Sequence, residues 1–202
     1  MIELDISDGL SVITLRRPEK ANALTAEMLE ALCEAVRESL GSSAMILTGE
    51  GKVFSAGADL EAAQSLALSP QWERLSGMIA DHRGLSIAAL NGTCAGGAMG
   101  MVLACDLRIG VESAKFFYPV MRLGFLPQPS DPKRLQTLVG PSRARMILMA
   151  GQKIAAQEAL TWGLLDRIVE PDALLAEARL LAGDALAATP LHVQRIGALF
   201  PS

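Results

Sequence analysis

The sequence predicts an α/β fold, because short apolar strands alternate with helices along the whole chain. Runs of strand length with apolar or β-branched composition stand at 10–15, 44–48 and 86–90. Each run is followed by a turn or a polar connection, and then by apolar residues at helical spacing. This order predicts a stack of strand–turn–helix units rather than separate helical and sheet regions.

The remaining elements continue this alternation. Thr25 stands at the N-cap position of a helix over 26–40, which Gly41 ends. Further helices are expected at 70–82, 133–139, 142–150, 155–163 and 172–187, with a partly helical stretch at 58–68. Further strands are expected at 107–111, 115–119 and 165–169, and prolines interrupt the chain between 119 and 132.

Composition excludes several classes of protein. With 202 residues the chain is long enough for one domain with a sizeable core. The net charge of −4, without any basic block, argues against a nucleic-acid partner. Cys33, Cys94 and Cys105 show no CxxC spacing, so they predict neither a disulfide framework nor a metal site, but buried thiols in a reducing compartment. The amino terminus lacks the basic and apolar regions of a signal peptide, so a cytoplasmic location is expected.

An uncharged stretch at 84–105 raises the question of a membrane partner. It contains Gly96 and Gly100 at the spacing that favours helix pairing in bilayers. The turn dipeptide at 91–92 and five glycines argue against a single membrane helix, because a turn would expose backbone polar groups to lipid. A buried strand, a turn and a buried helix are therefore predicted, with no membrane association.

Motifs of other enzyme classes are absent or incomplete. The segment GEGKVF has Phe54 where a dinucleotide-binding motif needs its third glycine, and Val53 follows Lys52 where a P-loop needs Ser or Thr. There is no G-x-S-x-G element. His82 and His192 stand outside any triad context and are expected to be surface or capping residues.

Two elements combine a strand end with glycine and other small residues: FSAGAD (54–59) and CAGGAMG (94–100). Backbone N–H groups at both turns, converging on one oxygen, would form an oxyanion hole. Close packing of strands against helices needs glycine equally well. The pattern alone leaves both interpretations open.

Five segments in order resemble the crotonase superfamily, the enoyl-CoA hydratase/isomerase family. They are LRRPEKANAL, ILTGEGKVFSAGADL, IAALNGTCAGGAMGMVLACDLRI, LGFLP and ALTWGLLDRIVEP, and the match runs in order from Leu10 to about Leu191. The resemblance implies a crotonase-like spiral of repeated ββα units and assembly into homo-oligomers, either trimers or hexamers. It also implies a core over 1–187 and a shortened C-terminal helical segment over 188–202.

The resemblance further implies an acyl-CoA thioester as substrate, with coenzyme A as part of that substrate and no separate cofactor or metal. The N–H groups of Ala58 and Gly97 match the family's oxyanion-hole donors. The residues that match the family's binding site for the nucleotide end of coenzyme A are Lys20, Ala21, Ala23, Ala58, Asp59, Leu60 and Glu61.

The family's two catalytic glutamates are replaced at the matching positions, where this chain has Gly100 and Val120. Neither side chain can transfer a proton. Candidates for a replacement acid/base are Asp131, then Tyr118 and Glu61. Each has a structural alternative: Asp131 as a helix-cap residue, Tyr118 as a packed aromatic and Glu61 as a solvated helix residue.

The sequence therefore predicts an acyl-CoA enzyme of the hydratase/isomerase type that stabilises a thioester enolate. The alternatives are a catalytically weak protein that binds CoA thioesters, and a crotonase-type decarboxylase or thioester hydrolase. Asp106, which closes the apolar run after the paired glycines, is expected to be structural.

Overall fold

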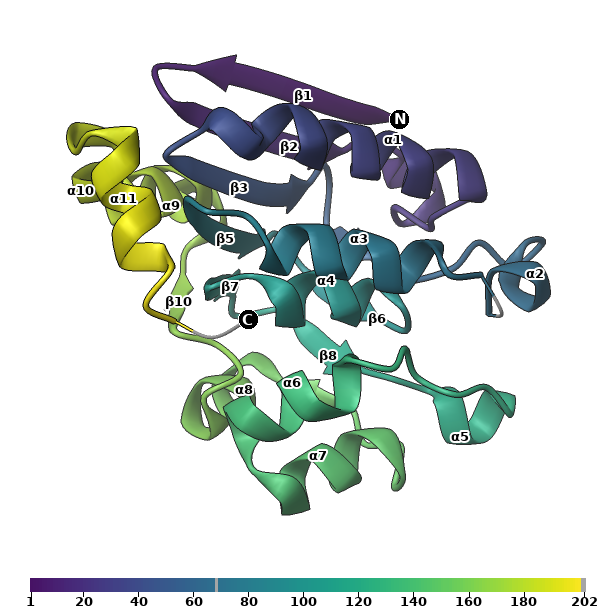
Figure 1. The fold of residues 1–202 in the computed structure, drawn as a ribbon. Helices are drawn as coiled ribbons and strands as arrows, with labels where there is room; N and C mark the ends of the chain where they lie inside the picture. The colour runs from purple at the N-terminus through teal and green to yellow at the C-terminus, as the bar shows by residue number, and fades with distance from the viewer. Residues whose placement is uncertain (68, 201–202) are drawn as a thin grey trace.

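Residues 1–67 and 69–200 are described by a computed structural model, whose centre is a six-stranded sheet (Figure 1). The strand order is β1-β2-β3-β5-β7-β10. β1 pairs antiparallel with β2, and the other neighbours in this sheet are parallel. Its strands are β1 (Ile2–Ser7), β2 (Leu10–Leu15), β3 (Ala44–Gly49), β5 (Leu85–Leu90), β7 (Leu107–Val111) and β10 (Arg167–Val169).

A smaller sheet has the order β4-β6-β8-β9, in which β4, β6 and β8 are parallel and β9 is antiparallel to β8. Its strands are β4 (Val53–Ser55), β6 (Thr93–Ala95), β8 (Lys115–Phe117) and β9 (Ile154–Ala155). In three successive units the first strand joins the large sheet, the second joins the small sheet, and a helix follows. These units confirm the predicted spiral of ββα repeats.

The helices cover the large sheet. Four of them form a row in which each packs on the next: α1 (Ala26–Glu38), α3 (Gln71–Ala80), α4 (Ala98–Ala104) and α6 (Asp131–Val139). α9 (Leu174–Leu181) packs on β5 and β7 from behind the sheet in the view of Figure 1. Ile46 and Leu47 are adjacent on β3, so they point to opposite faces, and both are buried. The large sheet is therefore covered on both faces.

The other helices are short. They are α2 (Ala63–Ala67), α5 (Val120–Leu123), α7 (Pro141–Leu148), α8 (Ala156–Trp162), α10 (Gly183–Ala187) and α11 (Pro190–Gly197), and 3-10 turns stand at Pro18–Lys20, Ser39–Gly41 and Pro171–Ala173. The partly helical stretch expected at 58–68 contains α2, and Leu68 lies outside the described residues.

Three predictions of local structure were wrong in detail. The helix expected over 172–187 is divided into α9 and α10, with the break at Ala182 beside Gly183, where glycine weakens a helix. The strand expected over 115–119 ends at Phe117, before Pro119. His82 is buried, so its surface alternative was wrong. The capping alternative agrees with its ring, which lies between the carbonyl oxygen of Ser39, the C-cap residue of α1 (3.0 Å), and the Gly84 N–H (3.1 Å).

The uncharged stretch at 84–105 contains β5, β6 and α4, as the turn dipeptide indicated. Within residues 1–67 and 69–200, no helix combines the length and the apolar character needed to cross a bilayer. The same residues contain no group of three or more His, Cys, Asp or Glu side chains arranged to hold a metal ion. All three cysteines are free and buried, as expected.

Candidate active site

The candidate site lies where the second strands of the three ββα units end. β4, β6 and β8 are parallel neighbours, so their carboxyl ends meet at one edge of the small sheet. Ala58 follows β4, Gly97 follows β6 and Tyr118 follows β8. The topology of the small sheet thus brings together segments that are 60 residues apart in the chain.

Two glycines let the first two of these turns touch. Gly57 and Gly96 both have positive φ angles, 91° and 57°, which glycine adopts without strain. A Cβ atom built on Gly57 would lie 2.8 Å from the Ala95 carbonyl oxygen and 3.4 Å from the Cα of Gly96. The two turns are therefore closely packed, and glycine at position 57 is what permits this contact.

Ala58 and Gly97 come directly after these touching glycines, and both are half-buried. In the described part of the chain, neither N–H group donates to a backbone or side-chain acceptor. The neighbouring backbone is instead paired: Leu24 N–H donates to Gly57, and Asp59 N–H donates to Leu24. Two unpaired donors thus lie at adjoining turns that paired backbone holds in place.

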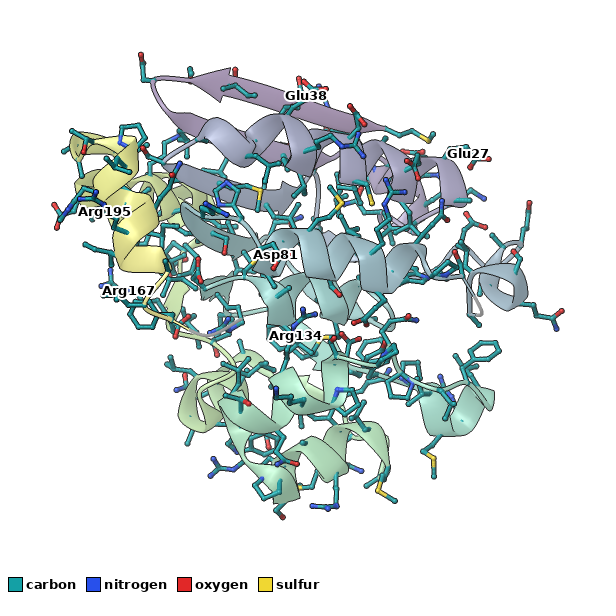
Figure 2. The ribbon with its side chains drawn as sticks, in the orientation of Figure 1. Glu27, Glu38, Asp81, Arg134, Arg167 and Arg195 are labelled. Carbon is teal, nitrogen blue, oxygen red and sulfur yellow. The ribbon has the colours of Figure 1, made fainter. Side chains whose placement is uncertain are left out.

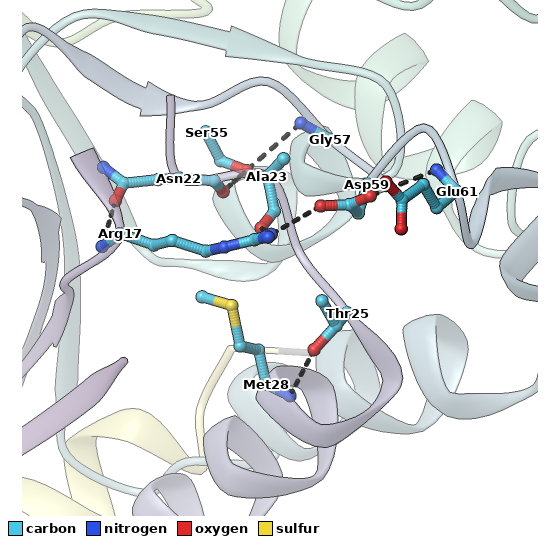
Figure 3. A network of polar contacts seen from close by, with 9 residues as sticks. All are labelled: Arg17, Asn22, Ala23, Thr25, Met28, Ser55, Gly57, Asp59 and Glu61. Atoms are coloured by element: carbon cyan, nitrogen blue, oxygen red, sulfur yellow. Dashed lines mark hydrogen bonds and ion pairs between the residues drawn. The ribbon is translucent and has the colours of Figure 1, made fainter. Parts of the chain in front are cut away.

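A polar network fixes the loop around residue 22 against the turn at Ala58 (Figure 3). Arg17 donates to the Asp59 carboxylate at 2.6 Å and to the Ala23 carbonyl at 2.9 Å. The Asn22 side chain is buried; it accepts from the Arg17 N–H and donates to the Val53 carbonyl. The hydrogen bond from Arg17 lowers the pKa of the Asp59 carboxyl. Sequence reasoning missed Arg17 and Asn22, although both lie within the first quoted segment of the resemblance.

The residues expected to hold the nucleotide end of coenzyme A gather around this network. The Lys20 side chain is exposed, Ala21 has a left-handed backbone, and Ala23 is half-buried. Leu60 is 93% exposed, and the Glu61 N–H donates to Asp59. Hydrogen bonds thus join the two segments into one partly exposed surface beside Ala58.

A buried carboxyl group lies beside Gly100. A Cβ atom built on Gly100 would be 2.9 Å from Oδ1 and 3.1 Å from Oδ2 of Asp131, so a side chain at position 100 would displace this carboxyl. Asp131 begins α6 and is fully buried. Its Oδ2 accepts a hydrogen bond from the Tyr118 hydroxyl at 2.9 Å. Its Oδ1 has no hydrogen-bond partner among the described residues.

Burial raises the pKa of Asp131 to about 7, because an ionised carboxylate is poorly solvated there. Glu73 also raises this pKa by repulsion, whereas the Tyr118 hydrogen bond and the charge of Arg134 lower it. Burial and the negative charge of Asp131 raise the pKa of the Tyr118 hydroxyl. Of the two groups, Asp131 is therefore the one whose pKa lies closer to neutral pH.

The first turn of α6 is tied to α3. Glu73 accepts hydrogen bonds from the N–H and the hydroxyl of Ser130. Arg134, which Figure 2 shows between α6 and the helices above it, donates to Ser76 at 2.9 Å. These contacts set the position of Asp131 relative to α4, which lies between α3 and α6.

The indole ring of Trp72 packs beside Gly97. A Cβ atom built on this glycine would lie 3.0 Å from ring atoms of Trp72, whose side chain is buried. Glycine at position 97 thus leaves room for the indole of α3.

The other residues singled out in the sequence make no hydrogen bond to Asp131 among the described residues. Val120 is buried at the start of α5. Glu61 is exposed. Asp106 accepts hydrogen bonds from the N–H and the hydroxyl of Ser86, which supports its structural assignment. His192 is exposed near the start of α11.

Comparisons with known proteins identify the family. The family model for enoyl-CoA hydratase/isomerase matches residues 5–200. The chain is 35% identical over 188 residues to a probable enoyl-CoA hydratase of Mycobacterium leprae, covering 90% of this chain and 73% of that protein. It is 34% identical over 203 residues to a crotonyl-CoA hydratase of Syntrophomonas wolfei, covering 96% and 78%.

A solved structure agrees in fold. An enoyl-CoA hydratase/isomerase from Pseudoalteromonas atlantica superposes with a TM-score of 0.90 at 29% identity, covering 98% of this chain and 81% of that one. The match extends over both sheets and the row of helices that carries the candidate site. The chain belongs to the enoyl-CoA hydratase/isomerase family of the crotonase superfamily.

Proposed function

We propose that the protein is an enzyme that acts on an acyl-CoA thioester and stabilises the thioester enolate with the N–H groups of Ala58 and Gly97. The observation that carries this proposal is the pair of unpaired donors at two touching turns. Membership of a family whose named members are enoyl-CoA hydratases and isomerases supports the choice of substrate.

The chemistry follows from the two donors. When a base takes a proton from the carbon next to the thioester carbonyl, the electron pair of the C–H bond forms a C=C bond and the π pair of the C=O bond moves onto the oxygen. Two preorganised N–H groups stabilise this oxygen, and each contributes about 3–4 kcal/mol in comparable sites. The donors need no reorganisation, because paired backbone on both sides already holds the turns.

For the acid/base group we propose Asp131. Gly100 and Val120 stand, by resemblance, at the positions of the family's two glutamates, and neither can hold a proton. The Asp131 carboxyl occupies the space beside Gly100, and its pKa of about 7 allows it to accept and return a proton near neutral pH. Because Oδ1 is enclosed, the acyl group reaches it only if neighbouring side chains move aside.

The nucleotide end of coenzyme A is assigned to the surface beside Ala58. Lys20 offers an exposed cation for a phosphate, and the backbone from Ala21 to Ala23 and from Asp59 to Glu61 lines the same surface. The Arg17–Asp59 ion pair keeps these two segments together. Coenzyme A enters as part of the substrate, and no other cofactor is invoked.

We also propose that the protein works as a homo-oligomer, trimeric or hexameric by resemblance, in the cytoplasm. Exposed apolar side chains on and after α5 support self-association: Met121, Leu123 and Leu126. The three free cysteines fit a reducing compartment.

Turnover of a panel of acyl-CoAs tests the proposed function. Saturated, 2-enoyl, 3-enoyl and carboxyl-bearing acyl groups report thioester hydrolysis, hydration, isomerisation and decarboxylation in turn. We expect catalysis of one of these reactions, together with calorimetric binding of free coenzyme A. Binding without turnover of any member would instead identify a CoA-thioester binding protein, and no binding at millimolar coenzyme A would contradict the proposal altogether.

A further inference from the structure

We propose that Tyr118 is a positioning residue, which holds Oδ2 of Asp131 so that Oδ1, the oxygen without a hydrogen-bond partner among the described residues, is the atom that exchanges a proton with the substrate. This inference rests on the proposed function, because it specifies how the acid/base group of that site is oriented. It assigns a role to a hydroxyl group that the oxyanion hole does not use.

The first step of the argument is the direction of the hydrogen bond. The Tyr118 hydroxyl lies 2.9 Å from Oδ2 and donates to it. The Gln128 N–H approaches the same hydroxyl at 3.5 Å and points a donor at its oxygen, which turns the hydroxyl hydrogen toward the carboxyl. Both side chains are buried, so no solvent competes for this hydrogen bond. Oδ2 is thus an acceptor, and a proton on the carboxyl resides on Oδ1.

The second step is the space around Oδ1. This oxygen has no partner among the described residues, which is costly for a buried polar atom. Only a glycine at position 100 leaves it that space, since a Cβ there would lie 2.9 Å away. A group that carries a proton to and from a substrate needs one oxygen held in place and the other free to bind the proton. A carboxyl with a purely structural role would be expected to have both oxygens hydrogen-bonded.

The third step is the set of charged and titratable groups that face this carboxyl. Cys94 on β6 and Tyr118 after β8 approach it from the small sheet, Glu73 approaches from α3, and Arg134 belongs to α6 itself. α4 contributes Gly100, which carries no titratable group. Of these groups, only Tyr118 makes a side-chain hydrogen bond to Asp131 in the described part of the chain. The orientation of the carboxyl therefore depends on Tyr118.

The test replaces Tyr118 by phenylalanine, which keeps the packed ring and removes the donor. Loss of a hydrogen bond to the ionised form raises the pKa of Asp131. We expect the limb of the pH–rate profile that reports Asp131 to move by about one pH unit to the alkaline side. We expect kcat to fall about tenfold because the carboxyl samples wrong orientations, with KM unchanged because Tyr118 does not touch the substrate.

A second readout does not depend on activity. Tyr118 is the only tyrosine in the sequence, so protein labelled with carbon-13 tyrosine gives a single ring resonance. In the native protein this resonance should shift with a midpoint near pH 7 as Asp131 ionises, and the shift should disappear in Asp131→Asn. Asp131→Asn is the control because it retains the volume of the side chain and cannot ionise.

The outcomes separate this inference from the proposed function. A native enzyme that turns over acyl-CoA, with an unchanged pH profile and kcat in Tyr118→Phe, would overturn the role of Tyr118 alone. A tyrosine resonance that does not follow Asp131 would overturn it as well. Absence of all turnover in the native protein would contradict the proposed enzymatic function. Proton transfer from Asp131 to a substrate would then be excluded as well.

Discussion

At the scale of single residues, the site depends on two glycines whose lack of a side chain leaves room for neighbouring side chains. Gly97 leaves room for the indole of Trp72, and Gly100 leaves room for the carboxyl of Asp131. In both cases a side chain from another helix occupies the place that a Cβ atom would need. Substitutions at these two positions therefore act through the neighbour that fills the space.

Gly97→Pro tests the proposed oxyanion hole, and Gly97→Ala is its matched control. Both variants bring a Cβ to about the same place beside Trp72, and the φ angle of −58° at Gly97 suits proline. Only proline removes the N–H group. We expect kcat with acyl-CoA to fall on the order of 10²–10³-fold more in the proline variant than in the alanine variant. Equal losses in both would place the donor elsewhere.

The ionisation of Asp131 also affects stability. Its pKa is about 7 in the folded protein and 3.8 in an ordinary environment, so the folded state binds the proton more tightly. The contribution is fully present below pH 3.8 and is lost as the pH rises through 7. Between pH 5 and pH 8 we expect the native protein to lose about 2–3 kcal/mol of unfolding free energy from this group.

Urea unfolding of the native protein and of Asp131→Asn at both pH values measures this effect. The asparagine variant lacks the titrating group, so its stability should fall less between pH 5 and pH 8. An identical pH dependence in the two proteins would show that Asp131 is already ionised at pH 5 in the folded state.

At the scale of elements, the contact between α4 and α6 has room for only one carboxyl group, that of Asp131 beside Gly100. Gly100→Glu would bring a second carboxyl against Asp131, where two buried like charges repel each other. We expect this variant to be destabilised by more than 2 kcal/mol, and Asp131→Ala in the same chain to recover 1–3 kcal/mol of that loss. The measurement is the free energy of unfolding over the double-mutant cycle.

Gly77→Glu on α3 is the control for placing glutamate on a helix. A Cβ atom at Gly77 would meet no atom within 4 Å, so this variant should be nearly neutral. If Gly100→Glu destabilises equally with and without Asp131, the shared space is not the reason for glycine at position 100. If the double variant keeps acyl-CoA turnover, a carboxyl from either helix serves the reaction.

At the scale of the whole molecule, large apolar side chains are exposed on and near α5. Met121 and Leu123 on α5 are 61% and 53% exposed, and Met149 after α7 is 59% exposed. A cavity of about 220 Å³ lies between these segments. Exposed apolar side chains concentrated around a hollow are typical of interaction surfaces.

We expect the protein to sediment as an oligomer at micromolar concentration. Met121→Glu should weaken the association by placing a charge in the apolar contact. Leu175→Glu on α9, far along the chain from α5, is the control and should leave the sedimentation coefficient unchanged. A native protein that sediments as a monomer would contradict the proposed assembly.

Much of the fold could be predicted from the sequence, because β2, β3, β5 and β7 are long enough to show their apolar character. For the three-residue strands β4 and β6 the sequence indicated only a strand end before each glycine turn and no strand bounds, since a run so short has no readable period. β1 was missed as well, although Ile2, Leu4 and Ile6 alternate with acidic or polar residues. That alternation would have identified it as a half-exposed edge strand.

The sequence by itself determined the α/β class and the two glycine turns, because these depend on local conformation and on motifs read within one segment. The ββα order followed from the resemblance to a known family. Only the tertiary structure decided that Asp131 on α6 fills the space beside Gly100 on α4, with Tyr118 holding one of its oxygens. The three residues are separated by as many as 31 positions, and no periodicity relates them. The three residues come together because α6 packs on α4. Packing between elements distant in the chain is set by the shapes of whole helix surfaces, which no single segment of sequence shows.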